Sequence, residues 1–311
     1  MLLACACALL AAPSAATDAI SVTPVRVSEH VWYVQGQSGP ASAANQGYIS
    51  NAGFVLTSEG VVVIDALGTP ALGQALLAAI RSVSAAPIKR VIVTHYHSDH
   101  FYGLPAFKSE GAEIWAHKSA RAYLEGSVAP ARLEQRRRVL APWVDENTPL
   151  LPPDRWLEGS TSFVLGGLHF DLIYVGPAHA PDDLVVNIRE DQALFSGDLV
   201  FSGRVPYVGD ADSRRWLAAM DELLRQNPKV MIPGHGAASS DAAADLVFTR
   251  DYLRYLRAAM GKAAEDMMPF EDAYKQTDWS PYLEMPAFDA ANRANAYGTY
   301  LLMERESLQK Q

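Results

Sequence analysis

Cysteine is nearly missing from this chain. Its 311 residues include only two, Cys5 and Cys7, and both belong to an apolar stretch at the N-terminus. Once that stretch is removed, the chain forms no disulfide and offers no thiolate to a metal or a substrate. Mechanisms that need a nucleophilic cysteine are therefore excluded for the processed chain, and so are metal sites with cysteine ligands.

Positive charge is in short supply as well. The sequence has 26 Lys and Arg against 35 Asp and Glu, a formal net charge of −9 at pH 7. An acidic surface repels nucleic acids and anionic membranes, so we expect no nucleic-acid partner. The one basic run, residues 136–138, lies in a segment of helical pattern and is predicted to occupy a solvated helix face. The sequence does not indicate an oligomeric state.

The apolar stretch at the N-terminus is too short to cross a membrane. Residues 1–12 are almost wholly apolar, whereas a membrane-spanning helix needs about 20 such residues. Residues 14–16 (Ser-Ala-Ala) fit a signal-peptidase site, so we predict a signal peptide over residues 1–16 and a periplasmic protein. No Lys or Arg precedes Arg26, and residues 2–5 resemble a lipoprotein processing box. The sequence leaves open whether the leader is a lipoprotein signal.

Strand and helix patterns alternate along most of the chain, but several strands follow one another directly. This order favours a layered α/β sandwich of mixed sheets over a doubly wound parallel sheet. Residues 118–158 interrupt the alternation, and we interpret them as an insertion that could form a lid. We predict a main domain over residues 17–245 and a helical C-terminal extension over 246–311. The predicted strands are 31–34, 51–56, 61–64, 88–93, 113–116, 162–165, 169–175, 184–188, 193–196 and 230–232, and the clearest helices are 69–82 and 213–226.

One short segment concentrates four potential metal ligands. His95, His97, Asp99 and His100 fall within six positions directly after the predicted strand 88–93. The side chains of His95 and His97 project the same way from an extended chain, so both can reach one metal ion. Asp99 and His100 follow where the chain turns into a helix, and they can face a second ion beside the first. Histidine and aspartate ligands suit zinc, and also iron or manganese.

The order His-x-His-x-Asp-His after a hydrophobic strand resembles the signature of the metallo-β-lactamase superfamily. The other positions of that family's pattern are also filled, in order, over roughly residues 22–240. His179 follows a strand, Asp198 follows a glycine, and His235 stands in a Pro-Gly-His-Gly turn. Asp65 ends an early strand. The resemblance implies an α/β fold of the four-layer αββα type, with the helical C-terminal extension added to it.

The resemblance also implies a role for each of these residues. Two zinc ions are expected, with iron or manganese as alternatives, and a hydroxide between the ions would be the nucleophile. Asp65 would accept a hydrogen bond that orients the histidines. Asp99 would pass a proton to the leaving group and is the predicted catalytic residue. The implied ligands are His95, His97 and His179 for one ion, Asp99, His100 and His235 for the other, and Asp198 as the bridge.

The ligand set narrows the expected small-molecule substrate. β-Lactamases with a cysteine ligand need a thiolate, and the histidine-rich β-lactamases lack a bridging aspartate like Asp198. The complete set resembles glyoxalase II and lactonases, so we expect hydrolysis of an ester, a thioester or a lactone. The leader and residues 51–55 and 97–103 resemble periplasmic hydrolases of quinoprotein or sulfur-oxidation systems. A β-lactam hydrolase and a mononuclear iron persulfide dioxygenase are the alternatives, and Tyr102 and Tyr207 are candidate substrate contacts.

Overall fold

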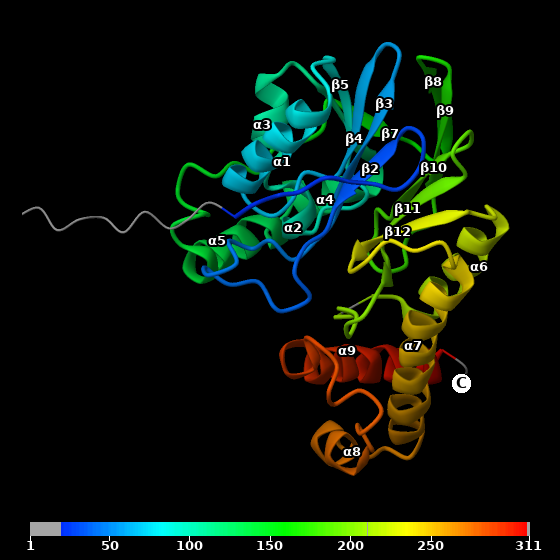
Figure 1. Ribbon diagram of the computed structural model, residues 1–311. Helices are drawn as coiled ribbons and strands as arrows, with labels where there is room; N and C mark the ends of the chain where they lie inside the picture. Colours follow the sequence, from blue (N-terminus) through cyan, green and yellow to red (C-terminus); the bar gives the residue numbers. More distant parts are fainter. Residues whose placement is uncertain (1–19, 210, 310–311) are drawn as a thin grey trace, which may run out of the picture.

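Two mixed β-sheets face each other at the centre of the protein, and helices cover the outer side of each sheet (Figure 1). The computed structural model describes residues 20–209 and 211–309. The predicted signal peptide over residues 1–16 lies outside the described residues, and so do Cys5 and Cys7. The order helix, sheet, sheet, helix confirms the predicted four-layer α/β sandwich.

The first sheet contains the strands of the N-terminal half. Its first four strands pair antiparallel with their neighbours in sequence, which requires only direct connections. From β4 onward the pairing is parallel, and helical segments make the crossovers. In order across the sheet, the strands are β1 (Val25–Arg26), β2 (Val31–Val34), β3 (Ala52–Thr57), β4 (Gly60–Ile64), β5 (Ile88–Ile92), β6 (Glu113–His117) and β7 (Arg155–Leu157).

The second sheet contains the strands of the C-terminal half. Four of them form an antiparallel meander, and the last joins in parallel after a helical crossover. The strand predicted to end at Ser196 runs on to Phe201, so Asp198 lies within it. Its pairing shifts register around Gly197, which marks an irregular, bulged stretch at the ligand-bearing position. In order, the strands are β12 (Val230–His235), β11 (Ala193–Phe201), β10 (Leu184–Ile188), β9 (Leu168–Tyr174) and β8 (Thr161–Leu165).

Helices begin where the sequence supplies capping groups. Thr69 accepts a hydrogen bond from the backbone N–H of Leu72 at the start of α1, and Pro70 occupies the first turn. Asp212 caps α6 in the same way through Arg215. Both starts agree with the sequence prediction. The helices are α1 (Pro70–Val83), α2 (Ser98–Phe101), α3 (Leu104–Ser109), α4 (Arg121–Glu125), α5 (Val128–Leu140), α6 (Ser213–Arg225), α7 (Ala242–Glu265), α8 (Phe270–Gln276) and α9 (Phe288–Leu308), with a short 3-10 helix at Lys118–Ala120.

Side chains that alternate along the strands fill separate apolar layers. Val62 and Ile64 on β4 belong to the core between the sheets, whereas Val61 and Val63 face the helices outside the first sheet. All four are buried, because β4 lies inside a sheet that is covered on both faces. A third apolar cluster, which includes the fully buried Trp216, packs the C-terminal helices against the second sheet.

Residues 118–158 contribute to the first sheet as well as to the helices. After α4 and α5 they end in β7, which pairs in parallel with β6. The sequence does not predict β7, because a three-residue strand after a proline-rich stretch has too little pattern to be recognised. The end of this segment is therefore part of the first sheet.

The C-terminal helices pack on one another and on the second sheet. α7 contacts both α9 and β11, and its buried face includes Tyr252 and Leu256. The predicted helical extension is present, and its boundary after residue 245 stays a prediction, since α7 begins at Ala242. Within residues 20–209 and 211–309, no helix has the length and apolar character needed to span a membrane.

Candidate metal centre

Histidine and aspartate side chains from both sheets meet at one edge of the sandwich. β5 leads into two of the histidines, and α2, which begins at Ser98, carries the next aspartate and histidine. The second sheet supplies the others from the loop after β9, from β11 and from the end of β12. The structure thus brings together all seven residues that were predicted as ligands: His95, His97, Asp99, His100, His179, Asp198 and His235.

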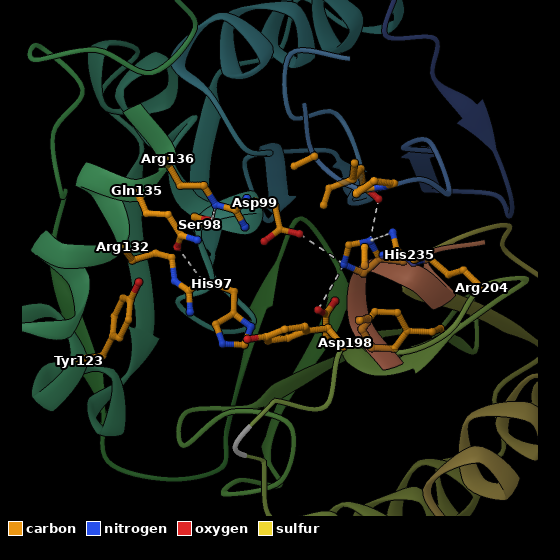
Figure 2. A pocket seen from close by; sticks show the side chains of 18 residues that line it. His97, Ser98, Asp99, Tyr123, Arg132, Gln135, Arg136, Asp198, Arg204 and His235 are labelled. Carbon is orange, nitrogen blue, oxygen red and sulfur yellow. Dashed lines mark hydrogen bonds and ion pairs between the residues drawn. The ribbon is translucent and has the colours of Figure 1, made fainter. Parts of the chain in front are cut away.

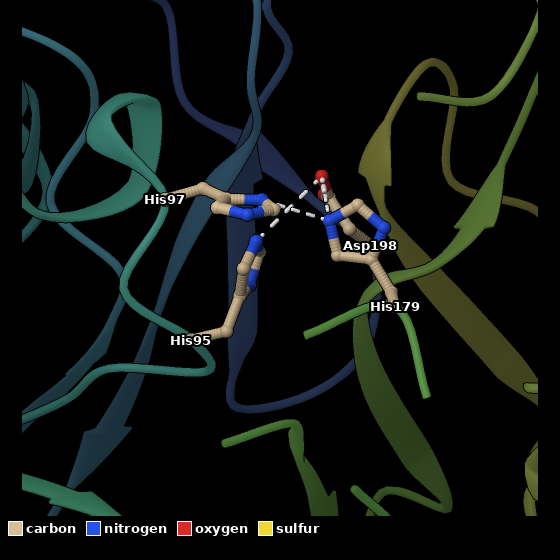
Figure 3. A group of neighbouring side chains, drawn as sticks. All are labelled: His95, His97, His179 and Asp198. Atoms are coloured by element: carbon tan, nitrogen blue, oxygen red, sulfur yellow. Dashed lines mark hydrogen bonds and ion pairs between the residues drawn. The ribbon is translucent and has the colours of Figure 1, made fainter. Parts of the chain in front are cut away.

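His95, His97, His179 and Asp198 form the first group of potential ligands (Figure 3). One ligand atom of each lies within 4.8 Å of the corresponding atoms of the others. Nε2 of His179 is 2.9 Å from Nδ1 of His97. Burial lowers the pKa of both rings, and that of His179 to about 3. Neutral imidazoles offer a lone pair to a metal ion, so these rings are in the form that binds one.

Asp99, His100 and His235 form the second group, again with ligand atoms within 4.8 Å of one another. Oδ2 of Asp99 is 3.4 Å from Nε2 of His235 and 3.8 Å from Nε2 of His100. Burial raises the pKa of Asp99, but the two neighbouring histidines outweigh it and hold the pKa below its usual value. The carboxylate is therefore ionised and able to bind a cation.

The carboxylate of Asp198 lies between the two groups. Its oxygens are 3.7 and 3.3 Å from Nε2 of His95 and His179 in the first group. They are 3.1 and 3.3 Å from Nε2 of His100 and His235 in the second. Burial opposes ionisation of Asp198, but His235 and His100 overcome this and hold its pKa well below the usual range. An ionised carboxylate at this place can contact ions in both groups, as a bridging ligand must.

Hydrogen bonds behind the rings turn Nε2 of the histidines toward the centre. Nδ1 of His100 donates to Oδ2 of Asp65 at 2.9 Å. Nδ1 of His235 donates to the backbone carbonyl of Ile49 at 2.6 Å. In its neutral form, a ring that donates from Nδ1 keeps the lone pair on Nε2, which leaves Nε2 free to bind a metal ion.

Asp65 connects these contacts to the first sheet. It follows β4 and has a positive φ of 61°. Its two oxygens accept hydrogen bonds of 2.8 Å from the backbone N–H and the hydroxyl of Thr94. The Thr94 hydroxyl also lies 3.1 Å from Nδ1 of His95. The structure thus confirms the expected hydrogen bond from the histidine cluster to Asp65.

Several polar atoms at the centre are buried without a hydrogen-bond partner. They include Nε2 of His95, and also Nε2 of His100 and Oδ1 of Asp198, which lie 3.1 Å apart without a hydrogen bond between them. Because buried polar atoms are normally satisfied, converging nitrogen and oxygen atoms that lack a partner fit a metal ion. The donor set is rich in histidine, contains carboxylates and has no sulfur, which suits zinc, iron or manganese.

Asn51 belongs to this centre, although its place in the sequence does not mark it as a site residue. Its side-chain Nδ2 donates to the carbonyls of Pro233 at 2.8 Å and Gly236 at 2.7 Å. These two hydrogen bonds hold both ends of the turn that carries His235. The sequence shows only a polar residue at the start of a predicted strand, and this pattern does not indicate which distant residues it contacts.

The metal-ligand groups open into a pocket of about 280 Å³ (Figure 2). This volume suits a small molecule. Tyr207 lines the pocket and stays a predicted substrate contact. The prediction for Tyr102 is wrong, because this side chain is fully buried against Phe101 and does not line the pocket. Residues 287, 290 and 291, all alanines at the start of α9, close one side, so the C-terminal extension packs over the site.

Arg132 and Arg136 reach the pocket from α5. Nε of Arg136 donates to Oγ of Ser98 at 2.9 Å, directly beside the ligand segment. The prediction that residues 136–138 lie on a solvated face is therefore wrong for the first of them. It is right for Arg138, whose side chain is 68% exposed. The reason is the helical period, which places residues 132 and 136 on one face and residue 138 on another.

Arg204 lines the opposite side of the pocket, as Figure 2 shows. It is 5% exposed, and its NH1 donates to the carbonyl of Gly39 at 3.3 Å and lies 3.5 Å from Nδ1 of His235. The latter nitrogen already donates to a carbonyl and has no lone pair to offer. Burial lowers the pKa of Arg204, while the charges of Asp198 and Asp99 oppose this effect. Cationic groups thus stand on both sides of the candidate metal centre.

The remaining histidines are not part of the two ligand groups. Two contact carboxylates and one stacks on a tyrosine. The pairs are His30 with Asp191 at 2.7 Å, His169 with Glu190 at 2.7 Å, and His117 with Tyr174 at a ring-centroid distance of 3.6 Å.

The αββα layers and the two ligand groups at the sheet edge define the class of protein, a metal-dependent hydrolase. The chain belongs to the family described as the Metallo-beta-lactamase superfamily, whose sequence profile matches residues 46–235. The resemblance inferred from the motifs is therefore confirmed at the level of the superfamily.

Two characterised relatives illustrate the range of the family. The Linear primary-alkylsulfatase of Pseudomonas sp. (strain ATCC 19151) is 26% identical over 234 residues, which cover 64% of this chain and 44% of that protein. The Metallo-beta-lactamase type 2 of Bacillus cereus is 26% identical over 250 residues, which cover 76% of this chain and 84% of that protein. The chain thus spans less than half the length of the alkylsulfatase.

Solved structures share the fold at lower identity. The metallo-beta-lactamase from Pontibacter korlensis has a TM-score of 0.59 and 24% identity, with 75% of this chain and 99% of that chain covered. The sec-alkylsulfatase Pisa1 from Pseudomonas sp. has a TM-score of 0.63 and 18% identity, with 90% and 50% covered. These relatives are β-lactamases and alkylsulfatases, so the finer resemblance to glyoxalase II stays a prediction.

Proposed function

We propose that the protein is a dinuclear zinc hydrolase that cleaves an ester, thioester or lactone bond. The position of Asp198 carries this proposal, because its carboxylate lies within 3.7 Å of Nε2 of two histidines in each ligand group. The second group, with Asp99, His100 and His235, is complete. A complete second group supports two ions over the single iron of a persulfide dioxygenase.

Two bound cations would supply a water that is acidic enough to ionise near neutral pH and would polarise the scissile bond. The chain itself orients the ligand rings through Asp65 and the Ile49 carbonyl. Asp99 lines the pocket and its side chain is 13% exposed, against 3% for Asp198. Asp99 is therefore the carboxylate that a substrate can reach, and we assign it the transfer of a proton to the leaving group.

The proposal favours esters over β-lactams for a geometric reason. The amide nitrogen of a β-lactam is a poor leaving group that needs an accessible second cation. In this site the carboxylate of Asp198 occupies the space between the two groups. The arginines around the pocket support a second candidate, hydrolysis of a sulfate ester, which is the activity in the names of two relatives.

Metal analysis combined with a substrate panel tests the proposal. We expect about two zinc ions per chain, loss of activity on chelation, and recovery with zinc or manganese. We expect kcat/KM for a thioester, lactone or aryl ester to exceed that for any penicillin by more than about tenfold, or 1.4 kcal/mol. About one iron per chain with oxygen uptake would favour a dioxygenase. Efficient carbapenem cleavage without ester cleavage would favour a β-lactamase.

A further inference from the structure

Helix α5 carries two positive charges on the face that lines the pocket. Arg132 and Arg136 are one helical turn apart and lie on the same side of the pocket, opposite Arg204 (Figure 2). Like charges at this spacing repel each other and destabilise a helix unless something compensates them. Within the part of the chain that the structure describes, no carboxylate forms an ion pair with either arginine.

The acidic residue of α5 is directed elsewhere. Glu134 pairs with Arg137 at 3.4 Å and with Arg138 at 3.3 Å on the outer side of the helix. Most other arginines in the described chain also have a carboxylate partner, as Arg189 and Arg257 do. The pocket-facing side of α5 therefore keeps its positive charge, whereas most arginines elsewhere are neutralised by a carboxylate. This positive charge persists although the net charge of the whole chain is −9.

Neighbouring side chains hold the two guanidinium groups in place. Nε of Arg136 donates to Oγ of Ser98, and NH1 of Arg132 donates to Oε1 of Gln135 at 3.1 Å. Among residues 20–209 and 211–309, none accepts a hydrogen bond from the terminal nitrogens of Arg136, so these can bind a ligand. Tyr123 lines the same side, and burial raises its pKa to about 12, so its hydroxyl is a further donor at neutral pH.

We infer that Arg132 and Arg136 bind an anionic group of the substrate, at a short distance from the bond that is cleaved. The inference rests on the proposed function and names the substrate class, an ester that carries a carboxylate or a sulfur oxyanion. Planar guanidinium groups pair with these anions through two parallel hydrogen bonds. Because one small pocket contains the arginine pair and the metal-ligand groups, the anion and the scissile bond belong to one molecule.

Matched substrates test the inference on the metal-loaded enzyme. 4-Nitrophenyl valerate is neutral, mono(4-nitrophenyl) glutarate has the same chain length with a terminal carboxylate, and 4-nitrophenyl 4-sulfobutanoate carries a sulfonate. We expect a preference for an anionic ester, expressed in KM, that declines as salt is added. Comparison of the two anionic esters shows which kind of anion the pair accepts. Equal kcat/KM for the neutral ester and both anionic esters would overturn the inference.

A double variant, Arg132→Gln with Arg136→Gln, ties the preference to the two side chains. We expect the ratio of kcat/KM for the anionic ester to that for the neutral ester to fall at least about tenfold. Arg138→Gln on the same helix removes one charge from the outer side and is the control, with an unchanged ratio. A ratio that survives in the double variant would exclude Arg132 and Arg136 as the anion site.

Binding without turnover separates this inference from the proposed function. Glutarate is added to metal-free protein, and its affinity is measured by calorimetry in the parent, the double variant and Arg138→Gln. We expect the double variant alone to lose at least about tenfold in affinity. If no ester is hydrolysed but this loss is observed, the proposed function fails and the anion site stands. Equal affinities in all three proteins would overturn the anion site whatever the activity.

Discussion

Nδ1 of His100 donates a hydrogen bond of 2.9 Å to the carboxylate of Asp65. Both side chains are buried. The bond connects a residue of the second ligand group to the end of β4, a strand in the middle of the first sheet. A carboxylate behind an imidazole fixes the orientation of the ring and increases the electron density on the nitrogen that binds the metal.

Asp65→Asn removes this carboxylate while it keeps the size of the side chain. We expect zinc affinity to fall roughly 10- to 100-fold, the usual effect of losing such an outer partner. Titration of metal-free protein with zinc against a competing chelator measures the change. Asp171→Asn, which breaks the ion pair with Arg189 far from the site, is the control. Parent-like zinc affinity in Asp65→Asn would show that the hydrogen bond does not support the metal site.

Asp198→Asn tests the bridging position. The amide has no charge, so it cannot compensate two cations between the four histidines. We expect bound zinc to fall from about two ions per chain to one or fewer, and kcat to fall at least about 100-fold, more than for a residue outside the ligand groups. Elemental analysis and steady-state kinetics give the two numbers. Retention of both ions and of the rate would mean that Asp198 is not the bridge.

Asn51→Ala removes the two hydrogen bonds that hold the turn of His235. The carbonyls of Pro233 and Gly236 then lose a buried donor, which costs about 1–3 kcal/mol of stability. We also expect weaker zinc binding in the second group, because the Nε2 position of His235 is no longer fixed. Urea unfolding and zinc titration measure the two effects, with exposed Asn147→Ala as the control. Unchanged zinc titration curves would limit the role of Asn51 to stability.

The hydrogen bonds of the buried Asp191 lead us to expect that the protein loses stability in acid for a reason unrelated to the metal site. Its side chain is 1% exposed and accepts hydrogen bonds from Ser28 and from the backbone and ring nitrogens of His30. Burial raises the pKa of Asp191, but these bonds outweigh it and lower the pKa below 3.8. With the folded pKa below the unfolded one, the stabilisation is present above about pH 4 and is lost as the pH falls through the folded pKa.

Asp191→Asn should therefore lower the free energy of unfolding by about 1–3 kcal/mol at pH 7. The difference from the parent should begin to shrink below about pH 4, where the carboxyl of the unfolded chain takes up a proton, and it should disappear as the pH falls through the folded pKa. Thermal unfolding of metal-free protein at several pH values measures this, with Glu125→Gln on the exposed surface of α4 as the control. A difference that stays constant between pH 7 and pH 3 would show that the charge of Asp191 is not the cause.

Local sequence was enough to predict the fold class and most of the centre. Val61 to Ile64 form a run of β-branched residues after a turn, so a strand could be predicted there before any partner was known. His95 to His100 are neighbours in the chain, and the strand that precedes them positions them together. His179, Asp198 and His235 were predicted through the family pattern and not through physical contact.

The tertiary structure alone decided which other side chains join the centre. The helical period shows that residues 132 and 136 share a face, but only the packing of α5 over α2 points that face at the pocket. The need for glycine at position 234 was also decided by a contact between elements, since a Cβ there would lie 2.0 Å from Oδ1 of Asp198 on a different strand. Spacing along one element is set by its own backbone geometry. Contacts between elements depend on how the whole core packs, and no local pattern encodes them.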